Sequence, residues 1–96
     1  MEELIEKVKT AKRIKTDAFN SEIEDLIQAA LYDLAITGVE NDDIRDPLIR
    51  TAIILYCKLH FGEPEGDIEW LQTSYNELKG HLRSATGYTD WGEDNE

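Results

Sequence analysis

The sequence predicts an all-α fold: a small bundle of three longer helices plus a short N-terminal helix, with an extended C-terminal arm. Three observations lead to this expectation. The length of 96 residues suits one small domain. Apolar residues recur three and four positions apart in several stretches, which is the spacing of one helix face. Residues 46–61, around which we expect the others to pack, open with a strong helix-start signal and are apolar on nearly every side.

The first helix is expected over residues 2–13, with a modest apolar stripe formed by Leu4, Ile5, Val8 and Ala11. Half of the ten basic residues lie in or just after this helix: Lys7, Lys9, Lys12, Arg13 and Lys15. At 3.6 residues per turn these side chains spread around the cylinder, and no aromatic residue stands among them to stack on bases. The pattern therefore favours a solvated helix surface over a nucleic-acid patch.

The second helix is expected over residues 18–37. Its apolar residues repeat at threes and fours and should form the buried face: Ile23, Leu26, Ile27, Ala30, Leu31 and Leu34. Ser21 and Glu24 fit a capping box, although neighbouring polar residues are also plausible caps. Gly38 can adopt the left-handed conformation that ends a helix.

An acidic loop follows at residues 39–45 and includes Asn41, Asp42 and Asp43. Such a cluster suggests calcium at first sight. The spacing differs from that of an EF-hand loop, and the central glycine and terminal glutamate are absent. The pattern therefore favours a solvated turn.

The central helix, residues 46–61, begins with Asp46 as the capping side chain and Pro47 at the first helical position. Cys57 is the single cysteine, and its apolar surroundings are typical of a small buried filler rather than a reactive thiol. His60 lies near the helix end, where a cation is favoured, and a positioned catalytic partner is lacking.

A third long helix is expected over residues 67–83, with Asp67 as its cap. One face carries a heptad-like seam formed by Ile68, Leu71, Tyr75, Leu78 and Leu82. This seam is short and is expected to dock onto the core. Trp70 lies off the seam, which makes it a candidate for contact with a partner.

We expect residues 1–83 to form the helical domain and residues 84–96 to form the C-terminal arm. The arm has no helical period, but it contains Tyr88 and Trp91 among polar residues. Aromatic residues are uncommon in disordered tails and frequent in binding hot spots. They would either anchor the arm on a partner or fold back onto this domain, and the sequence leaves both readings open.

The net charge of −11 argues against nucleic-acid binding by backbone neutralisation and against anionic membranes. The longest apolar run, residues 52–57, is far shorter than a membrane span, and the N-terminus lacks the features of a secretory signal. We therefore expect a cytosolic origin. No nucleophile elbow, phosphate loop or zinc-binding helix is recognisable. The sequence predicts no catalytic residue, no cofactor and no metal.

Four stretches form a recognisable series: VKTAKRI with TDAFN, DLIQAALYDLAITG, DPLIRTAIILYCKLHFGE, and YNELKGHLRSATGY. Each alone is an ordinary amphipathic pattern. In order, spacing and total length they resemble the small helical head–tail connector (head-completion adaptor) proteins of long-tailed bacteriophages, most of all those from phages of Gram-positive hosts. The turn FGEPEG departs from this pattern, because it is shorter and less basic than the loop often found there.

The resemblance implies a structural, non-enzymatic protein of the virion neck, made and assembled in the host cytoplasm. Such proteins bind as a ring beneath the portal protein after DNA packaging. They extend the DNA channel and provide the docking surface for a stopper or tail-completion protein. The acidity of this chain suits a channel wall that lets packaged DNA pass without specific binding.

Within that frame, the residues expected to line the channel are Glu22, Asp25, Asp42 and Asp43. Those expected to contact partners are Tyr88, Trp91, Trp70, Arg50, Ile54 and Lys58. In the central helix we expect burial within the subunit for Ile49, Ile53, Tyr56 and Leu59. Any intersubunit contact of that helix should lie nearer its other side, at Arg50, Ile54 and Lys58.

The main alternative is a small acidic adaptor or inhibitor that binds a single protein partner, for example as a DNA mimic. A DNA mimic needs carboxylates gathered on one face at phosphate-like spacing. Here they are distributed over several helices and loops, which favours the connector.

Overall fold

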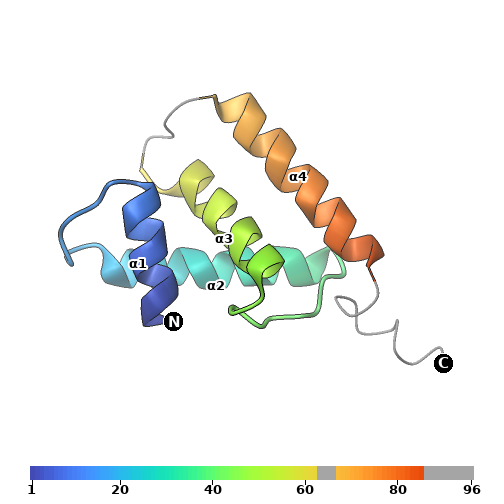
Figure 1. Ribbon diagram of the computed structural model, residues 1–96, viewed down its shortest axis with the longest axis horizontal. Coiled ribbons are helices and arrows are strands. Elements are labelled where there is room, and N and C mark those ends of the chain that lie inside the picture. Colours follow the sequence, from blue (N-terminus) through green and yellow to red (C-terminus); the bar gives the residue numbers. More distant parts are fainter. Residues whose placement is uncertain (63–66, 86–96) are drawn as a thin grey trace.

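The computed structural model describes residues 1–62 and 67–85, which form four helices and, over those residues, no strand. Figure 1 shows these helices in chain order: α1 (Glu2–Ala11), α2 (Asn20–Ile36), α3 (Pro47–His60) and α4 (Ile68–Ser84). The all-α prediction is confirmed. Each helix begins and ends within two residues of its expected bounds.

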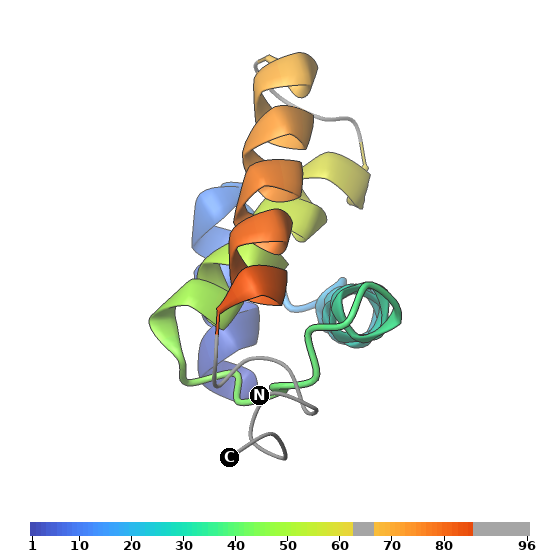
Figure 2. The ribbon, with the colours of Figure 1, turned by 90° about the vertical axis from the view of Figure 1, so that its right-hand side faces the viewer.

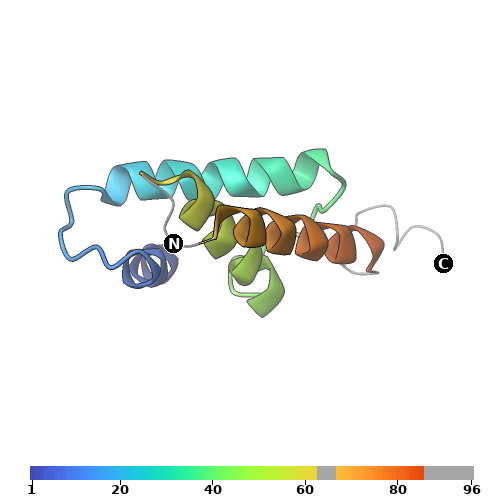
Figure 3. The same cartoon turned by 90° about the horizontal axis from the view of Figure 1, so that it is seen from above.

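α3 is the centre of the fold, because it packs against each of the other three helices. Seen from above, α2 runs along one side of the molecule and α3 and α4 lie on the other (Figure 3). Viewed along α2, the loop from α2 returns toward the start of α3 (Figure 2). This arrangement explains why α3 can be apolar on most of its circumference in so short a chain.

The core combines residues from all four helices. Its fully buried larger side chains are Leu4, Val8, Ile23, Ile27, Leu34, Val39, Ile49, Ile53, Cys57 and Leu82. The expected burial of Ile49, Ile53 and Leu59 is confirmed. The expectation for Tyr56 is wrong, since this side chain is only half-buried. Its ring lies at the border of the core, edge-on to Tyr75 with 5.7 Å between ring centroids.

The starts of α3 and α4 follow the sequence signals. Asp46 Oδ1 accepts hydrogen bonds from the backbone N–H groups of Leu48 at 2.9 Å and Ile49 at 3.3 Å. Asp67 Oδ1 accepts one from Trp70 N at 3.1 Å. These bonds satisfy amides that a helix start leaves without an intrahelical partner.

The capping box predicted for α2 is wrong. The capping position is occupied by Phe19, and no side chain caps the helix there. The chain instead enters α2 from a turn, in which Asn20 N donates to Asp17 O at 3.2 Å. Because helical hydrogen bonding begins at Phe19, Ser21 falls inside the helix, two residues after the capping position.

The end of α2 is a Schellman motif. Gly38 N donates to Ala35 O at 3.0 Å, and Val39 N donates to Leu34 O at 2.8 Å. Gly38 has a φ of 105°, which glycine adopts without strain. Val39 and Leu34 are both buried and supply the apolar contact that accompanies this motif.

The end of α1 has the same hydrogen-bond pattern with a different residue at its turning point. Arg13 N donates to Thr10 O at 3.1 Å, and Ile14 N donates to Lys9 O at 2.8 Å. Arg13 has a φ of 59°, in the left-handed region that glycine favours. This motif ends α1 at Ala11, two residues before the expected boundary.

Candidate interaction surfaces

Exposed large apolar side chains mark two candidate surfaces, since such groups on a folded chain often contact partners. The first lies on the last turns of α2, where Tyr32 is 71% and Ile36 is 70% exposed. The second lies at the start of α4, where Trp70 is 60% exposed and Ile68 is 51% exposed. The expectation that Ile68 docks onto the core with the rest of its seam is therefore wrong. Trp70 thus lies on the surface, and its contact with a partner stays a prediction.

Sequence reasoning missed Tyr32 and Ile36. The usable signal was their angular position, because they lie four residues apart and about half a turn away from the stripe of Ile23, Ile27 and Leu34. Burial of that stripe leaves the opposite side of α2 facing away from the core. Tyr32 and Ile36 on that side are accordingly exposed.

The expected contact strip on α3 is partly covered by the subunit itself. Arg50, Ile54 and Lys58 are all half-buried. Arg50 Nη2 lies 3.7 Å from Glu3 Oε1 on α1, and Arg50 Nε donates to Ile44 O at 3.1 Å. Arg50 therefore holds α1 and the preceding loop against α3.

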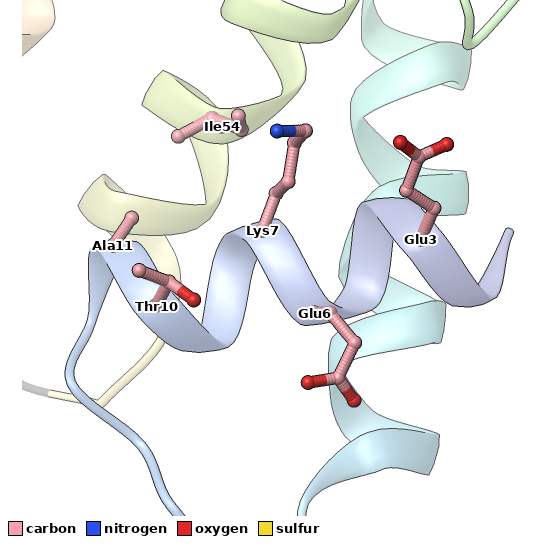
Figure 4. A pocket seen from close by; sticks show the side chains of 6 residues that line it. All are labelled: Glu3, Glu6, Lys7, Thr10, Ala11 and Ile54. Atoms are coloured by element: carbon pink, nitrogen blue, oxygen red, sulfur yellow. The ribbon is translucent and has the colours of Figure 1, made fainter.

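An open, mainly apolar groove runs between α1 and α3 beside this strip. Its lining residues are Glu3, Glu6, Lys7, Thr10, Ala11 and Ile54. In Figure 4 the side chain of Lys7 extends from α1 toward Ile54 on α3. Ile54 is the one strip residue that lines the groove, so a partner reaching α3 on this side meets α1 as well.

Glu22 and Asp25, two of the four expected channel carboxylates, lie together near the start of α2. Both are exposed and line a second groove with Phe19 and Phe61, among others. The two phenylalanine rings meet edge to face with 5.6 Å between their centroids. This groove is therefore lined by both aromatic and acidic side chains.

Asp42 and Asp43, the other two, are exposed in the loop after α2. Asp43 Oδ1 accepts hydrogen bonds from Arg45 N at 3.0 Å and Arg45 Nε at 3.2 Å, and these bonds hold the pKa of Asp43 below its usual value. α2 has 17 residues and a length of about 25 Å, so it separates this pair from Glu22 and Asp25. The four carboxylates do not form one cluster.

A polar contact ties α4 to α2. Tyr75 Oη donates to Asp33 Oδ2 at 2.6 Å, and Lys79 Nζ donates to the same oxygen at 3.1 Å. Burial alone would raise the pKa of Asp33, but the hydrogen bonds from Tyr75 and Lys79 outweigh it and lower that pKa. The pKa of Tyr75 is raised by burial and by its bond to Asp33.

Lys9 differs from the solvated position expected for it, because its side chain is almost fully covered. Its ammonium group forms an ion pair with Asp17 at 2.5 Å and a longer one with Glu6 at 3.5 Å. The hydrogen bond to Asp17 is the main cause that raises the pKa of Lys9. The pair fastens the loop after α1 onto the helix.

Cys57 is buried, and burial raises the pKa of its thiol to about 12. This keeps it protonated and unreactive near neutral pH.

In residues 1–62 and 67–85, no three His, Cys, Asp or Glu side chains are grouped to hold a metal ion. Among the helices of that part of the chain, none has the length and apolar character needed to cross a membrane. Tyr88 and Trp91 lie outside the described residues.

Comparison with known proteins supplies the functional frame for these surfaces. The family model of phage connector proteins matches residues 4–89, a span that includes most of α1 and all of α2, α3 and α4. Neither the curated proteins nor the solved structures gave a match. Because the family model matches nearly the whole chain, this protein belongs to the phage connector family, whose members are structural components of the head–tail connection.

Proposed function

We propose that this protein is the adaptor that binds beneath the portal protein of its phage as a ring. The family match over residues 4–89 is the observation that carries the proposal. The exposed apolar residues at the end of α2 and the start of α4 add support, since a ring subunit needs surfaces for its neighbours and for the portal. The ring extends the DNA channel and offers a docking surface to a stopper or tail-completion protein.

In this proposal the channel wall is acidic. Glu22 and Asp25 are exposed near the start of α2, and their charge repels the phosphates of passing DNA. Asp42 and Asp43 lie at the other end of α2, so all four residues line one channel if α2 runs around the wall of the ring. The channel wall thus lets the DNA pass without binding it.

Portal binding is assigned to the second apolar surface and the C-terminal arm. Trp70 is exposed at the start of α4 and offers a large apolar contact. We propose that residues 84–96 form an arm that Tyr88 and Trp91 anchor on the portal or on a neighbouring subunit. Residues 1–83 then form the body of the subunit.

The decisive experiment mixes the purified protein with the portal protein of the same phage and images the product by electron microscopy. A ring of this protein on the portal is the expected result. If the protein leaves the portal bare and instead forms a one-to-one complex with a basic protein, it is an acidic adaptor of the DNA-mimic kind. A DNA mimic needs its carboxylates on one face, and the separation of Glu22 and Asp25 from Asp42 and Asp43 does not favour such a mimic.

The arm has its own test. A chain that ends after Ala85 keeps all four helices and removes both aromatic residues of the arm. It should bind the portal at least about tenfold more weakly than the full chain, because each lost aromatic anchor costs more than about 1 kcal/mol. The matched control is the full-length chain with Tyr88→Ala and Trp91→Ala. Unchanged affinity in both would refute the arm.

A further inference from the structure

The loops before and after α2 differ in charge, and the first turns of α2 carry the exposed carboxylates Glu22 and Asp25 beside the first loop. The loop before α2 carries Arg13 and Lys15, both exposed, and Phe19 at the capping position is 40% exposed. Neither cation makes an ion pair within the described residues. We define this set of three residues as the basic end of α2.

The opposite end of α2 combines apolar and acidic groups. Tyr32 and Ile36 are exposed on its last turns, and Glu40 and Asp42 are exposed in the loop that follows. Neither carboxylate forms an ion pair within the described residues. We define these four residues as the acidic end of α2. Figures 1 and 3 show the two loops at opposite ends of the helix.

The cations near the acidic end do not cancel its charge. Arg45 is paired with Asp43, and Lys79 is paired with Asp33. The side chain of Arg83 lies against Gly38, on the side of α2 where α4 packs. α2 itself contains no lysine or arginine. A partner for this end therefore needs positive charge together with an apolar contact.

We propose that the basic end of α2 in one subunit binds the acidic end of α2 in the next. This inference rests on the proposed ring and names the contact that closes it. Arg13 and Lys15 lie opposite Glu40 and Asp42, while Phe19 covers part of the surface of Tyr32 and Ile36. The contact joins two different surfaces, which is the head-to-tail geometry that generates rings.

A second copy fits this surface, because it brings the exposed cations Arg13 and Lys15 together with the partly exposed ring of Phe19. With a net charge of −11, most faces of two copies repel each other. A two-fold contact of acidic end with acidic end would oppose like charges, and so would a contact of two basic ends. Of these three pairings, only the contact of unlike ends brings exposed cations opposite exposed carboxylates.

Charge reversal tests the contact. One variant carries Arg13→Glu and Lys15→Glu, and the other carries Glu40→Lys and Asp42→Lys. Each alone should fail to form rings on the portal. An equal mixture should form them, because each end then meets an end of opposite charge. A variant with Glu2→Lys and Glu77→Lys, both exposed and on α1 and α4, is the matched control and should assemble like wild type. Circular dichroism checks that every variant is folded. Rings from either reversed variant alone, or none from the mixture, would overturn the contact.

Cross-linking tests the contact without the portal. Ala18 and Ala35 are exposed near the two ends, and the native Cys57 is buried and unreactive. With a short thiol cross-linker at raised protein concentration, a mixture of Ala18→Cys and Ala35→Cys chains should give dimers, and the double variant should give a ladder. Dimers from either single variant alone, at the yield of the mixture, would contradict the pairing, as would no product in the mixture.

The two experiments separate the possible failures. If wild type leaves the portal bare but the mixed cysteine variants cross-link, the ring-on-portal function fails and the contact stands. If wild type forms rings but both charge-reversed variants also do so unaided, the contact fails and the proposed function stands.

Discussion

α3 and α2 are both rich in apolar residues, but they use them differently. α3 is enclosed by three helices, and Ile49, Ala52 and Ile53 on it are fully buried. α2 turns one stripe to the core and leaves Tyr32 and Ile36 on the opposite side exposed. The buried apolar residues on α3 therefore hold the fold together, whereas those on the outer side of α2 are available for assembly. Variants that compare the two helices can break or sharpen this distinction.

The largest difference is expected between Ile53→Ala on α3 and Ile36→Ala on α2. Ile53 is 0% exposed, so its truncation removes buried apolar surface and leaves a cavity, at a cost of about 2–5 kcal/mol in the free energy of unfolding. Ile36 is exposed, and its truncation should change that free energy by less than about 0.5 kcal/mol. Urea unfolding followed by circular dichroism measures both. A large loss for Ile36→Ala would show that the outer side of α2 belongs to the fold.

The second prediction concerns the polar contact through which α2 holds α4. Tyr75→Phe removes the hydrogen bond to Asp33 while keeping the ring in place. Because the acceptor is ionised but partly exposed, the expected loss is about 1–2 kcal/mol of unfolding free energy. Tyr32→Phe removes the same hydroxyl from an exposed position and is the matched control, with no measurable effect expected. Equal stability of the two variants would contradict the role of this contact.

The same contact predicts a dependence on pH. The pKa of Asp33 is lower in the folded protein than in the unfolded chain, where it is about 3.9. The folded state therefore gains stability from ionised Asp33 above pH of about 4, and this gain is lost as the pH falls through the lower folded-state pKa. Urea midpoints measured from pH 7 down to about pH 3 should fall less steeply for Tyr75→Phe than for wild type. Parallel profiles would count against the assigned pKa shift.

A third, smaller effect separates the starts of the two helices. Asp46 caps α3 with two hydrogen bonds, so Asp46→Ala should cost about 1 kcal/mol. α2 has no side-chain cap, so Ser21→Ala should change the stability by only a few tenths of that amount. Thermal unfolding of the two variants gives the comparison. If Ser21→Ala costs as much as Asp46→Ala, the capping box that the sequence suggests is formed in solution.

Local signals in the sequence were enough to predict most of this fold. The spacing of Ile23, Ile27 and Leu34 predicted the buried side of α2, and Asp46 and Asp67 predicted two helix starts. The failures depend on tertiary placement. Tyr56 is half-buried because of the side of α3 that each neighbouring helix covers. The periodicity of a single helix does not contain that information.

The candidate surfaces were less predictable than the fold. Trp70 was recognisable because it lies off a clear seam, and it is exposed as that position suggested. The exposure of Tyr32 and Ile36 could be predicted only with the knowledge that none of the other described helices covers the outer side of α2. The burial of Lys9 depends on Asp17, which only the turn after α1 brings within reach. Contacts of this kind arise from the chain path rather than from helix periodicity.

The smallest expected effect compares the ends of α1 and α2, which share one hydrogen-bond pattern. Gly38 ends α2 without strain, whereas Arg13 takes the same place on α1 with a φ of 59°. Arg13→Gly should therefore stabilise the subunit by about 0.5–1 kcal/mol, the relief of left-handed strain being partly offset by a more flexible unfolded chain. A rise of about 2–6 °C in Tm is expected.

The same change also removes a cation from the basic end of α2, so it should weaken assembly while it strengthens the fold. Arg13→Asn, which also tolerates positive φ but lacks the charge, is the matched control and should weaken assembly to a similar degree. Lys15→Gln removes a neighbouring charge without relieving backbone strain, so it should weaken assembly and leave Tm unchanged. If Arg13→Gly raises Tm and assembles as well as wild type, Arg13 contributes strain to the subunit but no contact to the ring. Opposite changes in Tm and assembly would explain why an arginine occupies a position that glycine fits better.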